Sequence, residues 1–502
     1  MNNTVNAALY ARVSTKNKGQ DPEMQLTELR GILTPGLRVQ LSRGRSIMNF
    51  GLLQARAFFA VAALFICVKT KLANRIFLRV HRQALCSILA TLGLSFGAMA
   101  ADSPTAKPAS SRHISGISLV GGPIIVLDHL TDHLPDALPD SQATAWKNAD
   151  GTVNLTIPWF ENYRMQGPDL EHLTVDSNKI FSSENQASDT VESHYNYWHW
   201  FLAPYTLDGE NIYVLTHTEW YACVLVGDCD QGNNQINSWE TSNNSFVSRD
   251  GGATWTANGV NGNQLIAAAG DHWTGSRELE LRVYRRALNH SGLFLPSRLI
   301  KEGNYYYSIG DEIHRNFGLL NRQTGEAPID EYGYVLIRTS DFTNPSGWEA
   351  WFGGSVFHSI RRGHFKTFLP QVNGSELNAS QVQLIYDVNA QTYIVIFTLY
   401  GTNGPVYYMT TNSLAAPSWS EPQVISGTAT FQPDPRGPSN NPCNTGFGPW
   451  NYVSDIDSSS AGMNFEFTSG SPWMFYVVNP VICGGNNMDR DVYRVQLSIS
   501  YQ

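Results

Sequence analysis

The chain has 502 residues, with 42 glycines, 24 prolines, 12% aromatic residues and 15% charged residues. This composition favours short strands separated by many turns, and it excludes both a disordered chain and a protein of long, charge-rich helices. The formal net charge is −9, and residues 101–502 alone carry 21 basic and 40 acidic side chains, a net charge of −19. Such a surface excludes long-range attraction to nucleic acid or to an anionic membrane.

The opening segment, residues 1–78, is set apart from the β-rich remainder. Its stretch AALYARVSTKNKGQDPEMQLTELR carries Tyr10, Arg12 and Ser14 in the pattern Tyr-x-Arg-x-Ser. Residues 7–30 thereby resemble the truncated N-terminus of a serine recombinase, which implies a Ser that attacks DNA phosphate and an Arg that stabilises the charge. The rest of that catalytic domain does not follow. We therefore expect residues 1–78 to be a non-native or spurious extension that cleaves no DNA.

Residues 79–100 have the layout of a secretory signal peptide. Arg79 and Arg82 precede an apolar run, which leads to a small-x-small site ending at Ala100. We expect cleavage there and a secreted mature protein, periplasmic or extracellular, that is monomeric and makes no contact with a membrane. The alternative is a membrane-anchored N-terminus.

A dense group of aromatic and titratable residues follows in SHYNYWHWFLAPYTLDGENIYVLTHTEWY, residues 193–221. His194 and His217 fall on two β-like runs joined by the turn LDGEN, so we expect them to approach each other from adjacent strands. A His of near-neutral pKa can take a proton, and aromatic faces stack on sugar rings. A purely structural role stays open for each His. The side chains predicted to stack on sugar are Tyr197, Trp198 and Trp220.

Four cysteines remain after the predicted cleavage, and an even number in an exported chain indicates disulfides whose pairing the sequence leaves open. These are Cys223, Cys229, Cys443 and Cys483. A structural Zn²⁺ site with a His is the alternative, although no C-x2-C spacing supports it. The run GDCDQGNNQ offers Asp228 and Asp230 to a structural Ca²⁺, with a solvated loop as its alternative. No cofactor is expected to be required for the chemistry.

The stretch FVSRDGGATWT, residues 246–256, has the pattern S-x-D-x-G-x-T-W. This is the Asp-box, a hairpin turn of sialidase-like β-propellers, which the sequence resembles here. The chemistry of the turn is local, because the Asp accepts backbone N–H groups, the Gly permits the tight turn and the Trp packs beneath it. A structural role is therefore predicted for Ser248, Asp250, Gly252, Thr254 and Trp255.

The pattern recurs in weakened form, which indicates a repeat architecture. The two weaker copies are Thr339-x-Asp341 with Trp348 and Thr410-x-Asn412 with Trp419. Each follows a β-rich run, as an outer blade hairpin would. At roughly 55 to 65 residues per four-stranded blade, about 400 residues predict an all-β, six- or seven-bladed β-propeller with Asp-box turns. Residues 101–502 form a single catalytic domain in this interpretation, and strand 490–500 lies beside 113–120 to close the ring.

A cationic group lies further along the chain. Arg is scarce in this acidic protein, and a guanidinium pairs bidentately with a carboxylate, so the Arg residues of this group are candidates to bind a substrate carboxylate. Solvated surface charge is the alternative for each of them. The residues of interest are Tyr284, Arg298, Arg361 and Arg362.

A secreted propeller with paired His, a Tyr and Arg in this order resembles the propeller-type polysaccharide lyases that cut uronate polymers such as ulvan, and the related rhamnosyl-glucuronidases. The resemblance implies an acidic polysaccharide substrate and β-elimination. It assigns His194 and His217 as catalytic, Tyr284 as acid or base, and Arg298 and Arg361, with Arg362, as the groups that neutralise the uronate carboxylate. Arg would stabilise the charge that develops as the C5 proton leaves.

Two other functions remain open at this stage. A sialidase-like or glucuronidase-type glycoside hydrolase needs two carboxyl groups near the scissile bond, for which the candidates are Glu219, Asp387 and Asp455. A non-catalytic carbohydrate-binding propeller needs the aromatic residues alone.

Overall fold

A computed structural model describes the chain from residue 112 onward, with gaps. The described residues are 112–129, 131–132, 139–183, 194–221, 239–259, 263–268, 291–293, 295–315, 330–360, 368, 370–372, 375–376, 379–399, 404–431, 450–478 and 490–502. They belong to a compact unit of residues 106–502. The predicted recombinase-like stretch, residues 7–30, and the predicted signal peptide, residues 79–100, lie outside the described residues. Among the described residues, no helix has the length and apolar character needed to cross a membrane.

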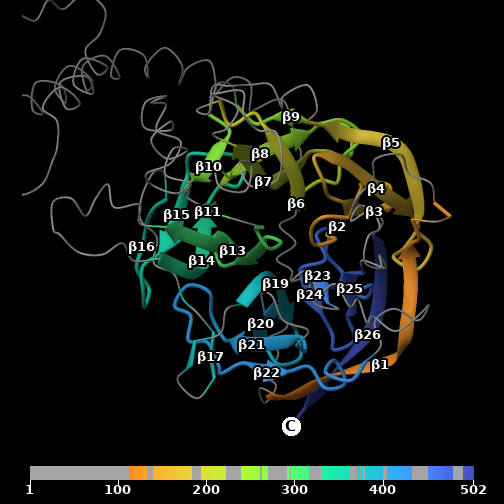
Figure 1. Cartoon of the computed structure of the whole chain (residues 1–502), viewed down its shortest axis with the longest axis vertical. Coiled ribbons are helices and arrows are strands. Elements are labelled where there is room, and N and C mark those ends of the chain that lie inside the picture. The colour runs from red at the N-terminus through yellow and green to blue at the C-terminus, as the bar shows by residue number, and fades with distance from the viewer. Residues whose placement is uncertain are drawn as a thin grey trace, which may run out of the picture. The chain divides into compact units, whose positions relative to one another are not determined.

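The unit is a five-bladed β-propeller, in which antiparallel sheets are arranged around a centre (Figure 1). Blade I is β2 (Ala145–Lys147), β3 (Val153–Ile157), β4 (Glu161–Gly167) and β5 (Thr174–Ser182). Blade II is β6 (Trp198–Thr206), β7 (Ile212–Tyr221), β8 (Trp239–Ser248) and β9 (Thr256–Ala257), with β10 (Leu265–Ala268) also on β8. Blade III is β12 (Ile300–Glu302), β13 (Tyr305–Arg315), β14 (Asp330–Thr339), β15 (Trp348–Trp351) and β16 (Phe357–Ser359).

Blades IV and V complete the ring. Blade IV is β19 (Ala379–Asp387), β20 (Thr392–Leu399), β21 (Tyr407–Thr411) and β22 (Gln423–Val424). Blade V is β23 (Asn451–Ile456), β25 (Trp473–Val478), β26 (Asp491–Tyr501) and β1 (Ile114–Leu127). Of the other short strands, β11 (Ser291–Leu293) joins blades II and III, and β17 (Gln371–Val372) pairs with β18 (Ser375–Glu376).

The predicted closure of the ring is confirmed, whereas the predicted number of blades is wrong. β1 pairs antiparallel with β26, from Ile114 opposite Tyr501 to Leu127 opposite Val492. The first described strand therefore supplies the outer strand of the last blade, which removes a sheet edge. The described strands form five blades rather than the predicted six or seven.

The turn after β8 has the local chemistry predicted for it. The Asp250 carboxylate accepts hydrogen bonds from the Thr254 backbone N–H at 2.9 Å and from its hydroxyl at 2.6 Å. The Ser248 hydroxyl accepts the N–H of Gly252, whose φ of +91° favours glycine. Trp255 is buried in the core between blades I and II. The turn is structural.

Of the two weaker repeats, the sequence located one correctly and the other one residue too early. In the turn after β14, the Thr339 hydroxyl accepts the N–H of Asp341, and Trp348 is buried, as in the turn after β8. In the turn after β21, Thr411 rather than Thr410 takes this place, because its hydroxyl accepts the N–H of Ser418. The prediction of Thr410 is therefore wrong by one residue.

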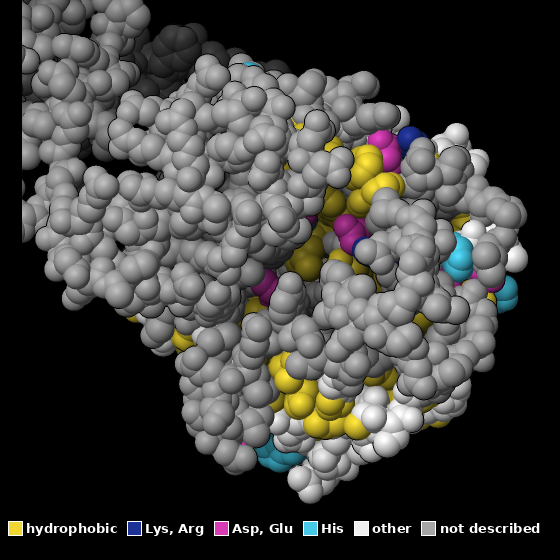
Figure 2. Space-filling model, in the orientation of Figure 1, with side chains coloured by type: hydrophobic (Ala, Val, Ile, Leu, Met, Phe, Trp, Pro, Cys, Tyr) yellow, Lys and Arg dark blue, Asp and Glu magenta, His cyan; other side chains and the backbone are white. Residues whose placement is uncertain are grey.

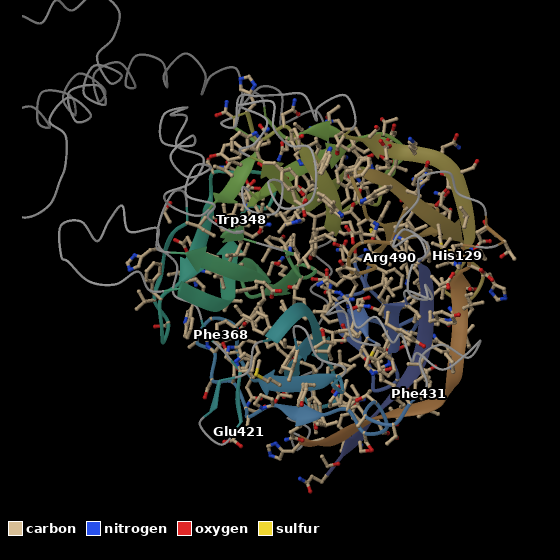
Figure 3. The ribbon with its side chains drawn as sticks, viewed as in Figure 1. His129, Trp348, Phe368, Glu421, Phe431 and Arg490 are labelled. Carbon is tan, nitrogen blue, oxygen red and sulfur yellow. The ribbon has the colours of Figure 1, made fainter. Side chains whose placement is uncertain are left out.

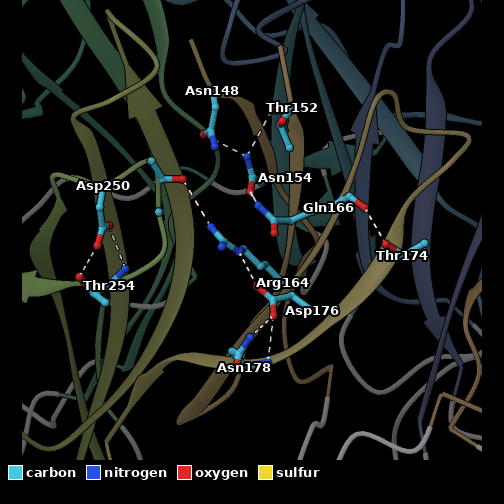
Figure 4. Close-up of polar contacts among 12 residues, drawn as sticks. Asn148, Thr152, Asn154, Arg164, Gln166, Thr174, Asp176, Asn178, Asp250 and Thr254 are labelled. Carbon is cyan, nitrogen blue, oxygen red and sulfur yellow. Dashed lines mark hydrogen bonds and ion pairs between the residues drawn. The ribbon is translucent and has the colours of Figure 1, made fainter. Parts of the chain in front are cut away.

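The hydrophobic core is divided among the interfaces between blades. Separate clusters of buried apolar side chains fill the contacts of blades I with II, II with III, III with IV, IV with V, and V with I. Polar contacts within blade I and toward blade II add to them (Figure 4). There, Arg164 pairs with Asp176 at 3.1 Å and donates to the Gly251 carbonyl of blade II.

Residues 457–472, between β23 and β25, form a crossing segment that reaches the first strand of every other blade. The Met463 carbonyl accepts the N–H of Lys147 in blade I at 2.7 Å. The Asn464 side chain accepts the N–H of Thr206 in blade II at 2.8 Å and donates to its carbonyl at 2.9 Å. Asn464 is 6% exposed, so water does not replace these bonds.

The same crossing segment binds blades III and IV. Oε1 of Glu466 accepts the Lys301 N–H at 3.1 Å and the Tyr205 hydroxyl at 3.0 Å. Arg298 donates to the Phe465 carbonyl at 2.8 Å. Strand β24 (Phe467–Thr468) of the segment pairs in parallel with β19 of blade IV. One loop of blade V thus holds the first strands together.

We expect Asn464→Ala to lower the free energy of unfolding by about 2 to 4 kcal/mol, because it leaves two buried backbone groups of Thr206 without partners. Urea unfolding followed by circular dichroism measures the loss. The matched control is Asn178→Ala, because Asn178 is exposed and bonds only within its own turn. Its effect should stay within about 0.5 kcal/mol. Equal effects of the two variants would contradict a bracing role for the crossing segment.

Candidate active site

The candidate site lies where β2, β6, β23 and β26 begin and β7 ends. Antiparallel pairing places Glu219, near the end of β7, opposite Trp198, the first residue of β6. Asp140 precedes β2, and Arg490 immediately precedes β26. Figure 3 labels Arg490 on the inner side of blade V, with His129 further toward the rim. On this face, Figure 2 shows acidic and basic side chains together in a hollow bordered by hydrophobic side chains.

Asp140 is held by a cation and a hydroxyl. Its Oδ1 is paired with the Arg490 guanidinium and accepts the Tyr452 hydroxyl at 3.0 Å. The side chain of Asp140 is 23% exposed, so solvent reaches the carboxylate. The site therefore presents the Asp140 carboxylate partly open to solvent and held by two donors.

The backbone of β23 is bent to place Tyr452 at this site. The pairing of β23 with β25 shifts register between Asn451 and Ser454, and Tyr452 has a φ of +53°. A non-glycine residue in this conformation is strained, and such strain gathers at functional sites. Burial, with the charge of Asp140, raises the pKa of Tyr452, so its hydroxyl stays protonated and donates.

Glu219 is a second carboxyl group in the opposite environment. It is 7% exposed, its Oε1 lies 3.0 Å from His217 Nε2, and its Oε2 accepts the Tyr221 hydroxyl. Burial raises the pKa of Glu219, although its contacts with His217 and Tyr221 oppose the shift. The charge of Asp140 adds to this increase.

These two groups can act as an acid and a base. A buried carboxyl group whose pKa is raised holds a proton that it can donate, and an ionised carboxylate can take a proton or attack an electrophile. The sequence predicts Glu219 as a candidate catalytic carboxylate. It does not predict Asp140, Tyr452 or Arg490. No short-range signal marks them, because three separate segments bring them together.

The structure gives the predicted His residues different places. His217 contacts Glu219, as described, and its strand neighbour Trp200 at a ring distance of 5.2 Å. His217 also contributes to lowering the pKa of a different residue, His199. The Nδ1 of His199 lies 2.7 Å from the Thr218 hydroxyl. His194 precedes β6, where its carbonyl accepts the Gln264 amide at 2.5 Å. A direct approach of His194 to His217 stays a prediction.

Of the three aromatic residues predicted to stack on sugar, only one is placed to do so. Trp220 is 1% exposed and Tyr197 is 6% exposed, so both belong to the core, and those two predictions are wrong. An aromatic ring must present a face to stack on a ligand. Trp198 is half-buried, so part of its side chain stays accessible to a ligand, and it stacks on Phe160 at 5.2 Å.

Arg298 is built into the interior. It is 3% exposed, donates to the backbone carbonyls of Asp455 and Phe465, and lies 3.8 Å from the Asp455 carboxylate. These contacts tie blades III and V together, so the structure gives Arg298 a structural role in place of the predicted binding of a substrate carboxylate. The other predicted residues Tyr284, Arg361, Arg362, Cys223, Cys229, Cys443, Cys483, Asp228 and Asp230 lie outside the described residues.

The other two carboxylates proposed for hydrolysis are structural. Asp387 is fully buried at the end of β19, where it accepts the Ala390 N–H at 2.6 Å and the Tyr501 hydroxyl at 2.6 Å. Asp455 pairs with Arg298, and burial raises its pKa to about 6. Both lie in contacts between blades rather than at the site of Asp140 and Glu219.

One group among the described residues has the spacing of metal ligands. The ligand atoms of Asp128, His129 and Asp491 lie within 4.8 Å of one another, in blade V. Asp491 is fully buried and accepts both the backbone N–H of His129, at 2.9 Å, and its Nδ1, at 2.7 Å. A divalent cation could bind there, but the His–Asp hydrogen bond already accounts for the arrangement.

Comparison with known proteins finds no family model and no curated protein that matches this sequence. Solved structures do match: an α-L-arabinofuranosidase catalytic domain of family GH62 from Coprinopsis cinerea is 10% identical, with a TM-score of 0.39, over 76% of this chain and 96% of that chain. An endo-1,5-α-L-arabinanase from Thermotoga petrophila is 9% identical, with a TM-score of 0.38, over 72% and 71%.

A protein of unknown function from Dyadobacter fermentans is 8% identical, with a TM-score of 0.40, over 77% of this chain and 100% of that chain. At such identities and scores these likenesses carry no functional argument. The five-bladed architecture rests on the strand pairing itself. Neither the resemblance to polysaccharide lyases nor that to serine recombinases gains support from the three structures.

We expect acid to destabilise the protein through His199. Burial, with the nearby His217, lowers the pKa of His199 from 6.5 to about 3. Between these values the unfolded chain binds a proton that the folded chain does not, so stability is fully present above about pH 6.5 and falls by up to about 1.4 kcal/mol per unit as the pH drops. Urea unfolding at pH 7, 6, 5 and 4 should show this slope reduced in His199→Gln. The exposed His172→Gln should keep it, and an unchanged slope in His199→Gln would refute the assignment.

Proposed function

We propose that this protein is a glycoside hydrolase that cleaves a polysaccharide, with Glu219 as the general acid and Asp140 as the general base or nucleophile. The observation that supports this most is the contrast between the two carboxyl groups. Burial raises the pKa of Glu219, whereas Asp140 is partly exposed and is held by the Arg490 guanidinium and the Tyr452 hydroxyl. Glycoside hydrolysis needs such a pair.

The mechanism follows from these roles. Glu219 donates its proton to the glycosidic oxygen as the bond to the anomeric carbon breaks, and the leaving sugar departs as an alcohol. Asp140 either removes a proton from the attacking water or forms a bond to the anomeric carbon that water then breaks. Tyr221 and His217 hold both oxygens of Glu219 and so fix its orientation.

Hydrolysis accounts for the site better than β-elimination does. A lyase needs a cation to neutralise a uronate carboxylate. Arg298 is engaged in the interior, and Arg490 is already paired with Asp140. Export of the mature chain after cleavage near Ala100 is part of the proposal, since it would bring the enzyme to a polymeric substrate.

The first test incubates the purified protein with neutral and acidic polysaccharides while product formation is followed in two ways. New reducing ends without absorbance near 235 nm support hydrolysis. An increase in absorbance at that wavelength reports the unsaturated uronate of β-elimination, and would replace the proposal by a lyase. Binding without either product would indicate a non-catalytic carbohydrate-binding propeller.

We expect Glu219→Gln and Asp140→Asn each to lower kcat by roughly 100- to 10,000-fold, because each removes one proton-transfer or nucleophilic group and keeps the shape of the side chain. The matched control is Glu421→Gln, since Glu421 is exposed and lies far from Arg490 in Figure 3. It should leave kcat unchanged. Full activity in either carboxyl variant, with folding verified by circular dichroism, would rule out its assigned role.

The pH profile should report Glu219. The hydroxyl of Tyr221 hydrogen-bonds the Glu219 carboxyl and lowers its pKa, so Tyr221→Phe should raise that pKa further. Activity that requires protonated Glu219 is lost as pH rises through this pKa. The alkaline limb of kcat/KM should therefore move to higher pH in Tyr221→Phe. A shift to lower pH would contradict the assignment of Glu219 as the acid.

A further inference from the structure

An aromatic row lies beside the two carboxyl groups. The rings of Trp159 and Phe160 have centroids 3.9 Å apart, and Phe160 stacks on Trp198 at 5.2 Å with an interplanar angle of 22°. Trp198 in turn meets the edge of Tyr221 at 5.3 Å. We call Trp159, Phe160 and Trp198 the aromatic platform.

The members of the platform are half-buried, whereas the aromatic residues beneath them are buried. Trp200 is 3% exposed and forms a small apolar cluster with Leu202, and Trp159 and Trp198 pack against that cluster from outside. Large aromatic side chains that keep contact with solvent at a candidate site indicate a ligand surface, because burial of their faces would be favourable.

The platform is connected directly to both carboxyl groups. The backbone N–H of Asp140 donates to the Pro158 carbonyl at 3.0 Å, in the turn that carries Trp159. Trp198 lies opposite Glu219 in the pairing of β6 with β7. A sugar bound on the platform would therefore lie next to a bond positioned between Asp140 and Glu219.

Hydrogen bonds hold the platform in place before any ligand binds. The Ser183 N–H donates to the Phe160 carbonyl at 2.9 Å, and the Ser183 hydroxyl accepts the His199 N–H at 3.0 Å, one residue after Trp198. Ser183 thus links the backbone of Phe160 to the backbone that follows Trp198. A surface ordered in advance loses little entropy on binding, which favours its use for recognition.

The charges around the platform select the kind of sugar. Asp140 and Glu219 are acidic, and Arg490, the cation that the described residues place at the site, is already paired with Asp140. A carboxylated or sulfated sugar on the platform would meet these acidic groups and would have to compete with Asp140 for Arg490. An uncharged ring meets no such cost and offers an apolar C–H face to the aromatic rings.

We propose that Trp159, Phe160 and Trp198 form a stacking subsite for an uncharged sugar residue of a polysaccharide, adjacent to the cleaved bond. The position of the subsite next to the cleaved bond rests on the proposed function. The binding of a sugar there rests on the platform alone. A neutral sugar at this subsite replaces the uronate expected from the sequence.

The test uses the full-length protein with Glu219→Gln as background, so that polymers bind without turnover. Affinity electrophoresis through arabinan, galactan, xylan, alginate and polygalacturonate gives dissociation constants. We expect a neutral polymer to bind best, and Trp159→Ala and Trp198→Ala each to weaken its binding roughly tenfold or more. Trp159→Phe and Trp198→Phe keep a ring and should lose less, which guards against a folding defect in the alanine variants.

Trp473→Ala is the matched control, because Trp473 is a half-buried Trp at the opposite end of blade V. Affinity that stays within about twofold in both alanine variants, or tighter binding of the acidic polymers, overturns the subsite. If the platform variants lose binding but the wild type releases no product, the subsite stands and the hydrolase proposal fails. If product forms and the platform variants bind normally, the hydrolase proposal stands and the subsite fails.

Discussion

The ring depends on the buried hydrogen bonds of the crossing segment, residues 457–472. Asn464 and Glu466 bind backbone groups of Thr206 and Lys301, and the Met463 carbonyl binds Lys147. The first strands of a propeller leave polar edges facing the centre, and a buried backbone group without a partner is costly. A single loop of blade V supplies partners to all four other blades. Burial raises the pKa of Glu466, and the Lys301 N–H and the Tyr205 hydroxyl both donate to its carboxyl group.

Closure of the ring and formation of the candidate site are linked. β1 forms the outer strand of blade V. After β1 the chain continues to Asp140, and blade I begins with β2. Arg490 and Tyr452 belong to blade V and reach Asp140 across this junction. The strained φ of Tyr452 is stable only because the bulged pairing of β23 holds it. The site is therefore a product of the closed ring.

The two carboxyl groups obtain different properties from different surroundings. Glu219 lies under aromatic rings at the end of a central strand, where loss of water favours its neutral form. Asp140 remains 23% exposed beside a cation and a hydroxyl. The half-buried platform beside them adds an apolar surface that two acidic groups alone would lack. In the proposed site an acid, a base and a stacking surface thus converge without a contribution from Arg298 or from the turn at Ser248, which serve the fold.

The sequence by itself determined the all-β propeller class, the closing strand pair and the chemistry of the turn at Asp250, because each rests on local alternation or on a short motif. It also marked Glu219 and Trp198. Only the tertiary structure decided the number of blades, because chain length does not show how strands pair into sheets. It also decided which aromatic and charged residues are buried: Trp220 and Arg298 resemble surface ligand groups in sequence but face the core. Asp140 lies more than 300 residues before Tyr452 and Arg490 in the chain. Only the packing of blade I against blade V brings these three side chains together.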